Sequence, residues 1–194
     1  VIEDIQKKEN IEEYFETLES EDAKPAAVLA YIDSVREELL DPEDASIRAS
    51  EKGDKAELAY CEVYREYDQY LEEQDKLDFP RMVQMAVKAL EHNAANGGSY
   101  LRKFKHVLVD EFQDINAAQK CMIDYFVSAN SHLWAVGDDY QAIYGWRGSN
   151  VRYMLDFKNS YKDSTVHALK VNYRSGRHIL QAAENLSNHF LEGF

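Results

Sequence analysis

The chain has 194 residues, 45% of them hydrophobic, which is enough for a soluble core. No apolar run reaches membrane-spanning length, and the two cysteines, Cys61 and Cys121, lie far apart, so the composition argues against a membrane protein, a disulfide framework and a zinc site and predicts a cytoplasmic protein. The net charge of −14 is unevenly distributed along the chain. Residues 1–100 carry 26 acidic and 11 basic side chains, whereas residues 101–194 carry 10 acidic and 11 basic ones. Contact of the second half with a polyanion would therefore depend on local cations and aromatic side chains.

Residues 1 to about 75 are predicted to be helical, because apolar residues recur there at helical spacing between charged ones. Pro25 and the Asp41-Pro42 pair divide this region. The tyrosine-rich stretch at 58–71 is interpreted as a packing face rather than a ligand platform. A further amphipathic helix is predicted at 77–92.

After residue 100 the pattern changes to alternating strands and helices. Buried strands are predicted at 107–109, 133–136 and 166–171, and helices at 116–127 and from 175 to about 190. The first strand is expected to be buried on both faces. Alternation of this kind predicts a parallel sheet with right-handed crossovers.

Two adjacent carboxylates, Asp110 and Glu111, follow the first predicted strand directly. Open α/β folds place their ligands at the carboxyl ends of parallel strands. There, one carboxylate can hold Mg²⁺ while the other orients or deprotonates a water for attack on a phosphoryl group. The alternative is that both are solvated loop residues or part of a helix cap.

Three segments resemble motifs II, III and IV of the UvrD/Rep family of superfamily 1 DNA helicases: VDEFQD at 109–114, VGDDYQAIYGWRGS at 136–149 and LKVNYRS at 169–175. The resemblance spans Phe104 to about Asn188. It implies an α/β fold with a partial RecA-like P-loop NTPase parallel sheet and an N-terminal all-helical subdomain. The implied boundaries are a helical insertion at 1–76, the later part of the first motor domain at 77–170, and the start of the second at 171–194.

For the nucleotide site, the resemblance implies that Asp110 binds Mg²⁺, Glu111 is the catalytic base and Gln141 senses the γ-phosphate of ATP. It further implies that Tyr173 stacks on the adenine and that Arg174 is an arginine finger. The alternatives are a turn residue for Gln141, a core residue for Tyr173 and a surface cation for Arg174. Gln113 and Asp114 receive no firm role, and helix capping is one possibility for Asp114.

For DNA, the resemblance implies that Tyr144 and Trp146 stack on the bases of a single strand beside the charge of Arg147. The alternative is a buried aromatic plug. Two positions depart from the family pattern: Tyr140 replaces an acidic residue and Ala142 replaces a serine. We expect these changes to tune the function without abolishing it.

The resemblance thus implies an ATP-dependent DNA helicase that moves along single-stranded DNA and unwinds duplex junctions in repair, replication or recombination. No GxxxxGK[ST] loop occurs in the 194 residues, and the chain starts without Met. We therefore expect an internal piece that is inactive without the remainder of the helicase chain.

Three alternatives remain open at this point. The first is the motor segment of a helicase-nuclease recombination subunit, and the second is a truncated, non-catalytic DNA-binding module. The third is an unrelated metal-dependent hydrolase that uses Asp110, Glu111, Asp138 and Asp139. It would leave Trp146, Tyr173 and Arg174 without a role.

Overall fold

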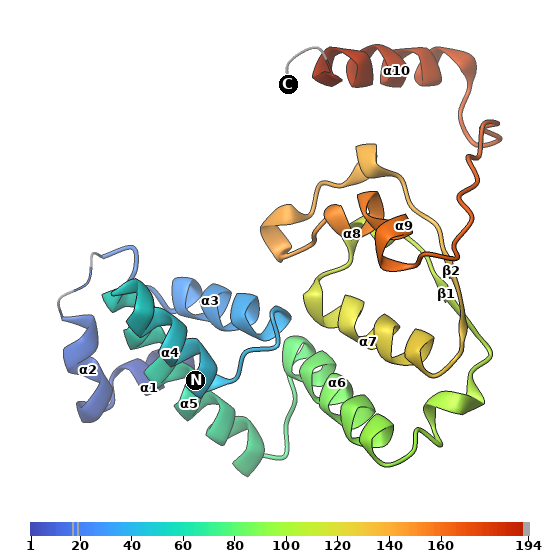
Figure 1. Ribbon diagram of the computed structural model, residues 1–194. Helices are drawn as coiled ribbons and strands as arrows, with labels where there is room; N and C mark the ends of the chain where they lie inside the picture. Colours follow the sequence, from blue (N-terminus) through green and yellow to red (C-terminus); the bar gives the residue numbers. More distant parts are fainter. Residues whose placement is uncertain (17, 19, 192–194) are drawn as a thin grey trace.

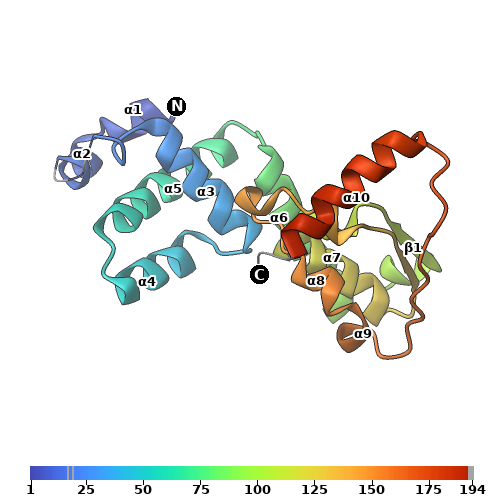
Figure 2. The same ribbon diagram turned by 90° about the horizontal axis from the view of Figure 1, so that it is seen from above.

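The computed structural model describes residues 1–16, 18 and 20–191. Figures 1 and 2 show a group of helices beside a second group that contains the sheet, with α6 between them. The first group consists of α1 (Ile2–Gln6), α2 (Glu9–Phe15), α3 (Pro25–Glu37), α4 (Pro42–Lys52) and α5 (Lys55–Glu73). The predicted helical character of the first 75 residues is therefore confirmed.

Local sequence signals set the limits of these helices. Pro25 and Pro42 lie in the first turns of α3 and α4. Backbone N–H groups in a first turn have no acceptor within the helix, so a proline there costs no hydrogen bond. The Asp41 carboxylate accepts a hydrogen bond from the N–H of Asp44 (3.0 Å) and caps α4. Gly53 ends α4 with φ +68°, a left-handed conformation that glycine adopts without strain.

The core of the first group forms where α5 packs against α1 to α4. Val63 and Tyr64 of α5 are fully buried against Val28 and Ile32 of α3. The tyrosine-rich stretch is a packing face, as predicted, since Tyr60 is buried as well.

The helix α6 (Phe79–Ala95) connects the two groups, because it packs against both α3 and α7 (Ala117–Ser128). Asp78 caps α6 by accepting a hydrogen bond from the N–H of Arg81 (2.8 Å). At the start of α7, the side chains of Asn116 and Gln119 each bond the other's backbone N–H in a capping box.

The sheet consists of two parallel strands, β1 (His106–Val109) and β2 (His132–Ala135), paired with His106 opposite His132. Their connection runs through α7. Phe112, Ile115 and Ile123 form a small core beneath one face of this sheet.

The expectation that β1 is buried on both faces is wrong, since Leu108 is 78% exposed. In β2, Trp134 is also exposed. The apolar side chains that pack on the core belong to the other face, for example Val109 and Leu133. Within the described residues, only this one face is covered by a packed layer, so alternate residues of each strand face solvent.

The segment after β2 contains two one-turn helices, α8 (Arg152–Leu155) and α9 (Phe157–Ser160), and ends in α10 (Arg177–Leu191). The strand predicted at 166–171 does not form, because in the described chain its backbone pairs with no other strand and Val166, Leu169 and Val171 are exposed. This segment runs extended to α10, which stands apart in Figure 1. Among the described helices, none combines the length and apolar character needed to cross a bilayer.

Candidate functional site

The carboxyl ends of β1 and β2 lie at one edge of the sheet. The N–H of Val136 donates to the carbonyl of Val109 (2.9 Å), and the N–H of Phe112 donates to the carbonyl of Val136 (2.9 Å). The loop that carries Asp110 and Glu111 is therefore fastened to the end of β2. Glu111 adopts φ +49° and ψ +46°, a left-handed conformation that strains a residue with a side chain.

Gln113 connects the two strand ends from a fully buried position, with 1% of its surface exposed. Its Nε2 donates to Glu111 Oε2 (2.8 Å), and its Oε1 accepts from the N–H of Asp138 (3.0 Å). A Cβ on Gly137 would lie 2.7 Å from Gln113 Oε1, so this close approach requires glycine. The role of Gln113 depends on a glycine two dozen residues away, which the sequence pattern did not reveal.

Asp138 extends these contacts to Gln141. Its Oδ1 accepts from the N–H of Tyr140 (3.1 Å), and its Oδ2 accepts from Gln141 Nε2 (2.8 Å). A continuous polar chain therefore leads from Glu111 through Gln113 and Asp138 to Gln141. Gln141 itself is exposed and can reach a ligand.

Asp110 is exposed next to this polar chain. Its Oδ1 accepts from the N–H of Glu111 (3.0 Å), which leaves Oδ2 for a cation. In the part of the chain that the structure describes, no group of three or more His, Cys, Asp or Glu side chains could hold a metal ion alone. Mg²⁺ fits such a site, because it usually takes one or two protein carboxylates and completes its shell with phosphate oxygens and water.

A loop with two aromatic side chains and one arginine follows the polar chain along the sequence. We call residues 144–148 the aromatic loop. The rings of Tyr144 and Trp146 lie 6.4 Å apart at 52°, and the Arg147 guanidinium lies 5.6 Å from the Trp146 ring. Trp146 is 80% exposed, so the buried-plug alternative is wrong for this residue. An exposed indole beside a cation suits stacking on nucleic-acid bases.

Tyr173 and Arg174 are placed differently from the other predicted site residues. Tyr173 is 93% exposed, so the core alternative does not apply to it. The Asn172 side chain accepts hydrogen bonds from the N–H groups of Arg174 and Ser175 (2.9 Å each) and orders the turn before α10. Among the described residues, no hydrogen bond or ion pair joins Tyr173 or the Arg174 side chain to the carboxylates at the sheet edge.

Comparison with known proteins decides the family. A family model described as the UvrD/REP helicase N-terminal domain matches residues 2–162. The chain belongs to the UvrD/REP helicase family. It is 32% identical over 97% of its length to the ATP-dependent DNA helicase PcrA of Staphylococcus epidermidis, of which it covers 25%. It is 35% identical over 84% of its length to the ATP-dependent DNA helicase UvrD1 of Mycobacterium tuberculosis, of which it covers 22%.

Membership of the UvrD/REP helicase family confirms the resemblance inferred from the motif strings. The chain spans about a quarter of the length of the curated relatives that it matches. The family model ends at residue 162, before the extended segment and α10.

Proposed function

We propose that the chain is part of an ATP-dependent DNA helicase that moves along single-stranded DNA and unwinds duplex junctions. The observation that carries this proposal is the polar chain from Glu111 to Gln141, which ends three residues before the exposed aromatic loop. Groups suited to ATP hydrolysis and to base stacking thus occupy one continuous segment. The names of the relatives, ATP-dependent DNA helicases, support the same function.

Each residue at the sheet edge has a chemical role in this proposal. The Asp110 carboxylate would hold Mg²⁺, and the ion would supply positive charge to neutralise the phosphates of ATP. The Glu111 carboxylate accepts a proton from the attacking water, and the buried Gln113 amide fixes its Oε2. The Gln141 amide can donate to the γ-phosphate and accept from water, so it can report the state of the nucleotide to the adjacent aromatic loop.

Tyr173 and Arg174 are proposed to complete the nucleotide site by stacking on the adenine and by binding the γ-phosphate. This role requires the segment before α10 to approach the sheet edge. The segment is extended, and among the described residues its backbone pairs with no strand. We assign residues 1–76, 77–170 and 171–194 to the helical insertion, the first motor domain and the start of the second.

The substitution Glu111→Gln in the full-length protein tests the catalytic part of the proposal. Loss of the base should lower kcat for single-strand-stimulated ATP hydrolysis by about 10²- to 10⁴-fold, while ATP still binds. Steady-state hydrolysis and nucleotide-binding titrations measure the two effects. Glu91→Gln on the exposed side of α6 is the matched control and should retain full activity. Wild-type turnover by Glu111→Gln would refute the assignment.

A further inference from the structure

The last turn of α3 touches the aromatic loop at Gly148. This glycine has φ +74°, and a Cβ built on it would overlap the carboxylate of Glu37. The Glu37 side chain therefore lies directly against the backbone turn that follows Trp146 and Arg147. A partly open pocket of about 290 Å³ lies between the same elements, and Glu37 and Gly148 both line it.

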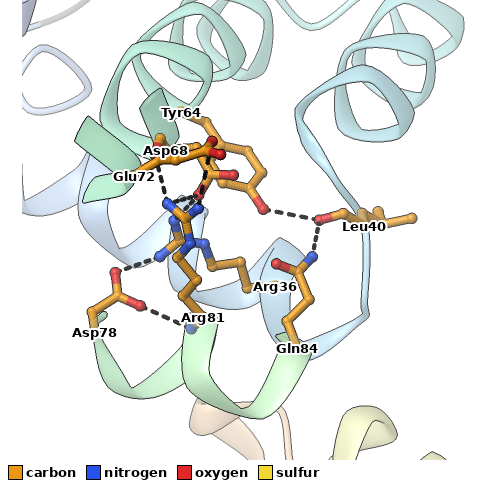
Figure 3. A network of polar contacts seen from close by, with 8 residues as sticks. All are labelled: Arg36, Leu40, Tyr64, Asp68, Glu72, Asp78, Arg81 and Gln84. Atoms are coloured by element: carbon orange, nitrogen blue, oxygen red, sulfur yellow. Dashed lines mark hydrogen bonds and ion pairs between the residues drawn. The ribbon is translucent and has the colours of Figure 1, made fainter. Parts of the chain in front are cut away.

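Neighbouring contacts fix the position of Glu37. The preceding residue, Arg36, is fully buried and pairs with Asp68 of α5 (2.6 Å) and with Asp78, the cap of α6 (Figure 3). The guanidinium also lies 5.0 Å from the Tyr64 ring. Successive residues of a helix point about 100° apart, so Arg36 holds the end of α3 in the helical core while Glu37 faces another side.

The charge of Glu37 also acts on this region. Burial raises the pKa of Glu37 and Asp33 adds to the effect, whereas Asn116 and Arg147 act in the opposite direction. The carboxylate therefore lies in the field of the cation on the aromatic loop. Its contact with Gly148 and its attraction to Arg147 both connect α3 to this loop.

We propose that Glu37 is a positioning residue for the aromatic loop, supporting the Gly148 turn so that Trp146 and Arg147 are held ready for a single strand. This inference rests on the proposed DNA-binding role of the loop. It makes the helical group a support of DNA binding, because the Arg36 contacts transmit the position of α5 and α6 to Glu37. A movement of the helical group would then change the affinity of the aromatic loop for single-stranded DNA.

Two substitutions of Glu37 in the full-length protein test the contact. Glu37→Ala removes the support and should weaken binding of fluorescent oligodeoxythymidylate about three- to tenfold, as measured by anisotropy. Glu37→Gln keeps the shape of the side chain against Gly148 and removes only the attraction to Arg147, so it should lose less affinity than Glu37→Ala. Unchanged affinity in Glu37→Ala, or equal losses in both variants, would overturn the positioning role.

The neighbouring Glu38 provides a matched control. Glu38 lines the same pocket, but its carboxylate pairs with Arg48 of α4 (2.6 Å) and the atoms nearest to Gly148 belong to Glu37, so Glu38 carries the same charge without that contact. Glu38→Ala should bind the oligonucleotide as tightly as the wild type does. A loss equal to that of Glu37→Ala would show that any negative charge in this turn suffices and would overturn the proposal.

A double substitution tests the contact independently of overall stability. Gly148→Ala should weaken binding in the wild type, because the new Cβ overlaps Glu37 and the positive φ is strained. In the Glu37→Ala background the overlap is gone, so the same substitution should cost less affinity. Additive losses would mean that the two residues act separately and would refute the proposal.

Trp146→Ala separates failure of this inference from failure of the proposed function. If Trp146 stacks on a base, its removal should weaken oligonucleotide binding about five- to 150-fold. Wild-type affinity in Trp146→Ala would reject the DNA-binding role of the loop, and the positioning role with it. A loss in Trp146→Ala without a loss in Glu37→Ala would reject the positioning role alone.

Discussion

At the scale of single residues, Gln113 determines how the two strand ends are joined. A neutral amide can donate to a carboxylate and accept from a backbone N–H at the same time, and Gln113 does both from a buried position. An apolar side chain there would leave the N–H of Asp138 and the Glu111 carboxylate without these partners. The position of the proposed base thus depends on a residue that itself performs no chemistry.

We predict that Gln113→Ala lowers the free energy of unfolding by about 1–3 kcal/mol, because it removes a fully buried amide and the two hydrogen bonds that this amide makes. Chemical denaturation of the variant and the wild type measures this difference. Gln141→Ala is the comparison, since Gln141 is exposed and its removal should change stability by less than about 0.5 kcal/mol. Equal effects of the two substitutions would contradict the bridging role.

At the scale of helices, the ion pairs of Arg36 join α3, α5 and the start of α6 (Figure 3). Burial alone would lower the pKa of Arg36, but Asp78, Tyr64 and Asp68 raise it more, so the guanidinium keeps its charge. In the same network, Arg81 pairs with Asp68 (3.2 Å). Ion pairs between two arginines and two aspartates therefore hold the helical group against α6.

We predict that Arg36→Ala destabilises the protein by about 3–5 kcal/mol, because it removes the buried partner of Asp78 and one of the two cationic partners of Asp68. Urea denaturation gives the size of the effect. Arg65→Ala on the exposed side of α5, where Arg65 pairs with Glu62, should cost at most about 1 kcal/mol. A cost for Arg36→Ala no larger than this would show that the buried ion pairs contribute little.

The elements differ in how far the sequence predicts them. Helix starts were predictable because their signals are local, as with Pro25 of α3, the Asp41-Pro42 pair of α4 and Asn116 of α7. The exposure of Leu108 in β1 was not predictable from the local sequence, because it depends on which element covers the second face of the sheet. The prediction of a strand at 166–171 was wrong for a related reason. A strand forms only beside a partner strand, and the local sequence does not specify that partner.

The candidate site shows the same division. The motif strings predicted that Glu111 and Gln141 belong to one site, and the structure connects them through hydrogen bonds. The strings did not predict the bridging role of Gln113 or the support of Gly148 by Glu37. Both contacts join segments that are distant in sequence, and only the folded chain brings those segments together.

At the scale of the whole molecule, the acidic helical group and the nearly neutral sheet-bearing part differ in charge. Residues 1–76 contain 24 of the 36 acidic side chains and 9 of the 22 basic ones, and the proposed DNA contacts lie beyond them in a part with balanced charge. An acidic surface repels the phosphate backbone. Contact of DNA phosphates with the helical group is therefore electrostatically unfavourable.

We predict that the 194-residue chain alone shows no single-strand-stimulated ATP hydrolysis above background. Its sequence contains no GxxxxGK[ST] loop, whose backbone N–H groups and lysine hold the phosphates of a nucleotide. Phosphate release from the purified chain, compared with the full-length protein, measures the difference. A helical circular dichroism spectrum would establish that the chain is folded, and robust turnover by it would contradict the prediction.

The left-handed backbone of Glu111 lowers the stability of the protein at a position whose side chain is proposed to be catalytic. A non-glycine residue in this conformation costs about 1–3 kcal/mol, and glycine would avoid much of that strain. A laboratory selection for heat resistance alone would therefore favour Glu111→Gly. The same replacement would remove the proposed base. A variant stabilised at this position would therefore lose catalytic activity.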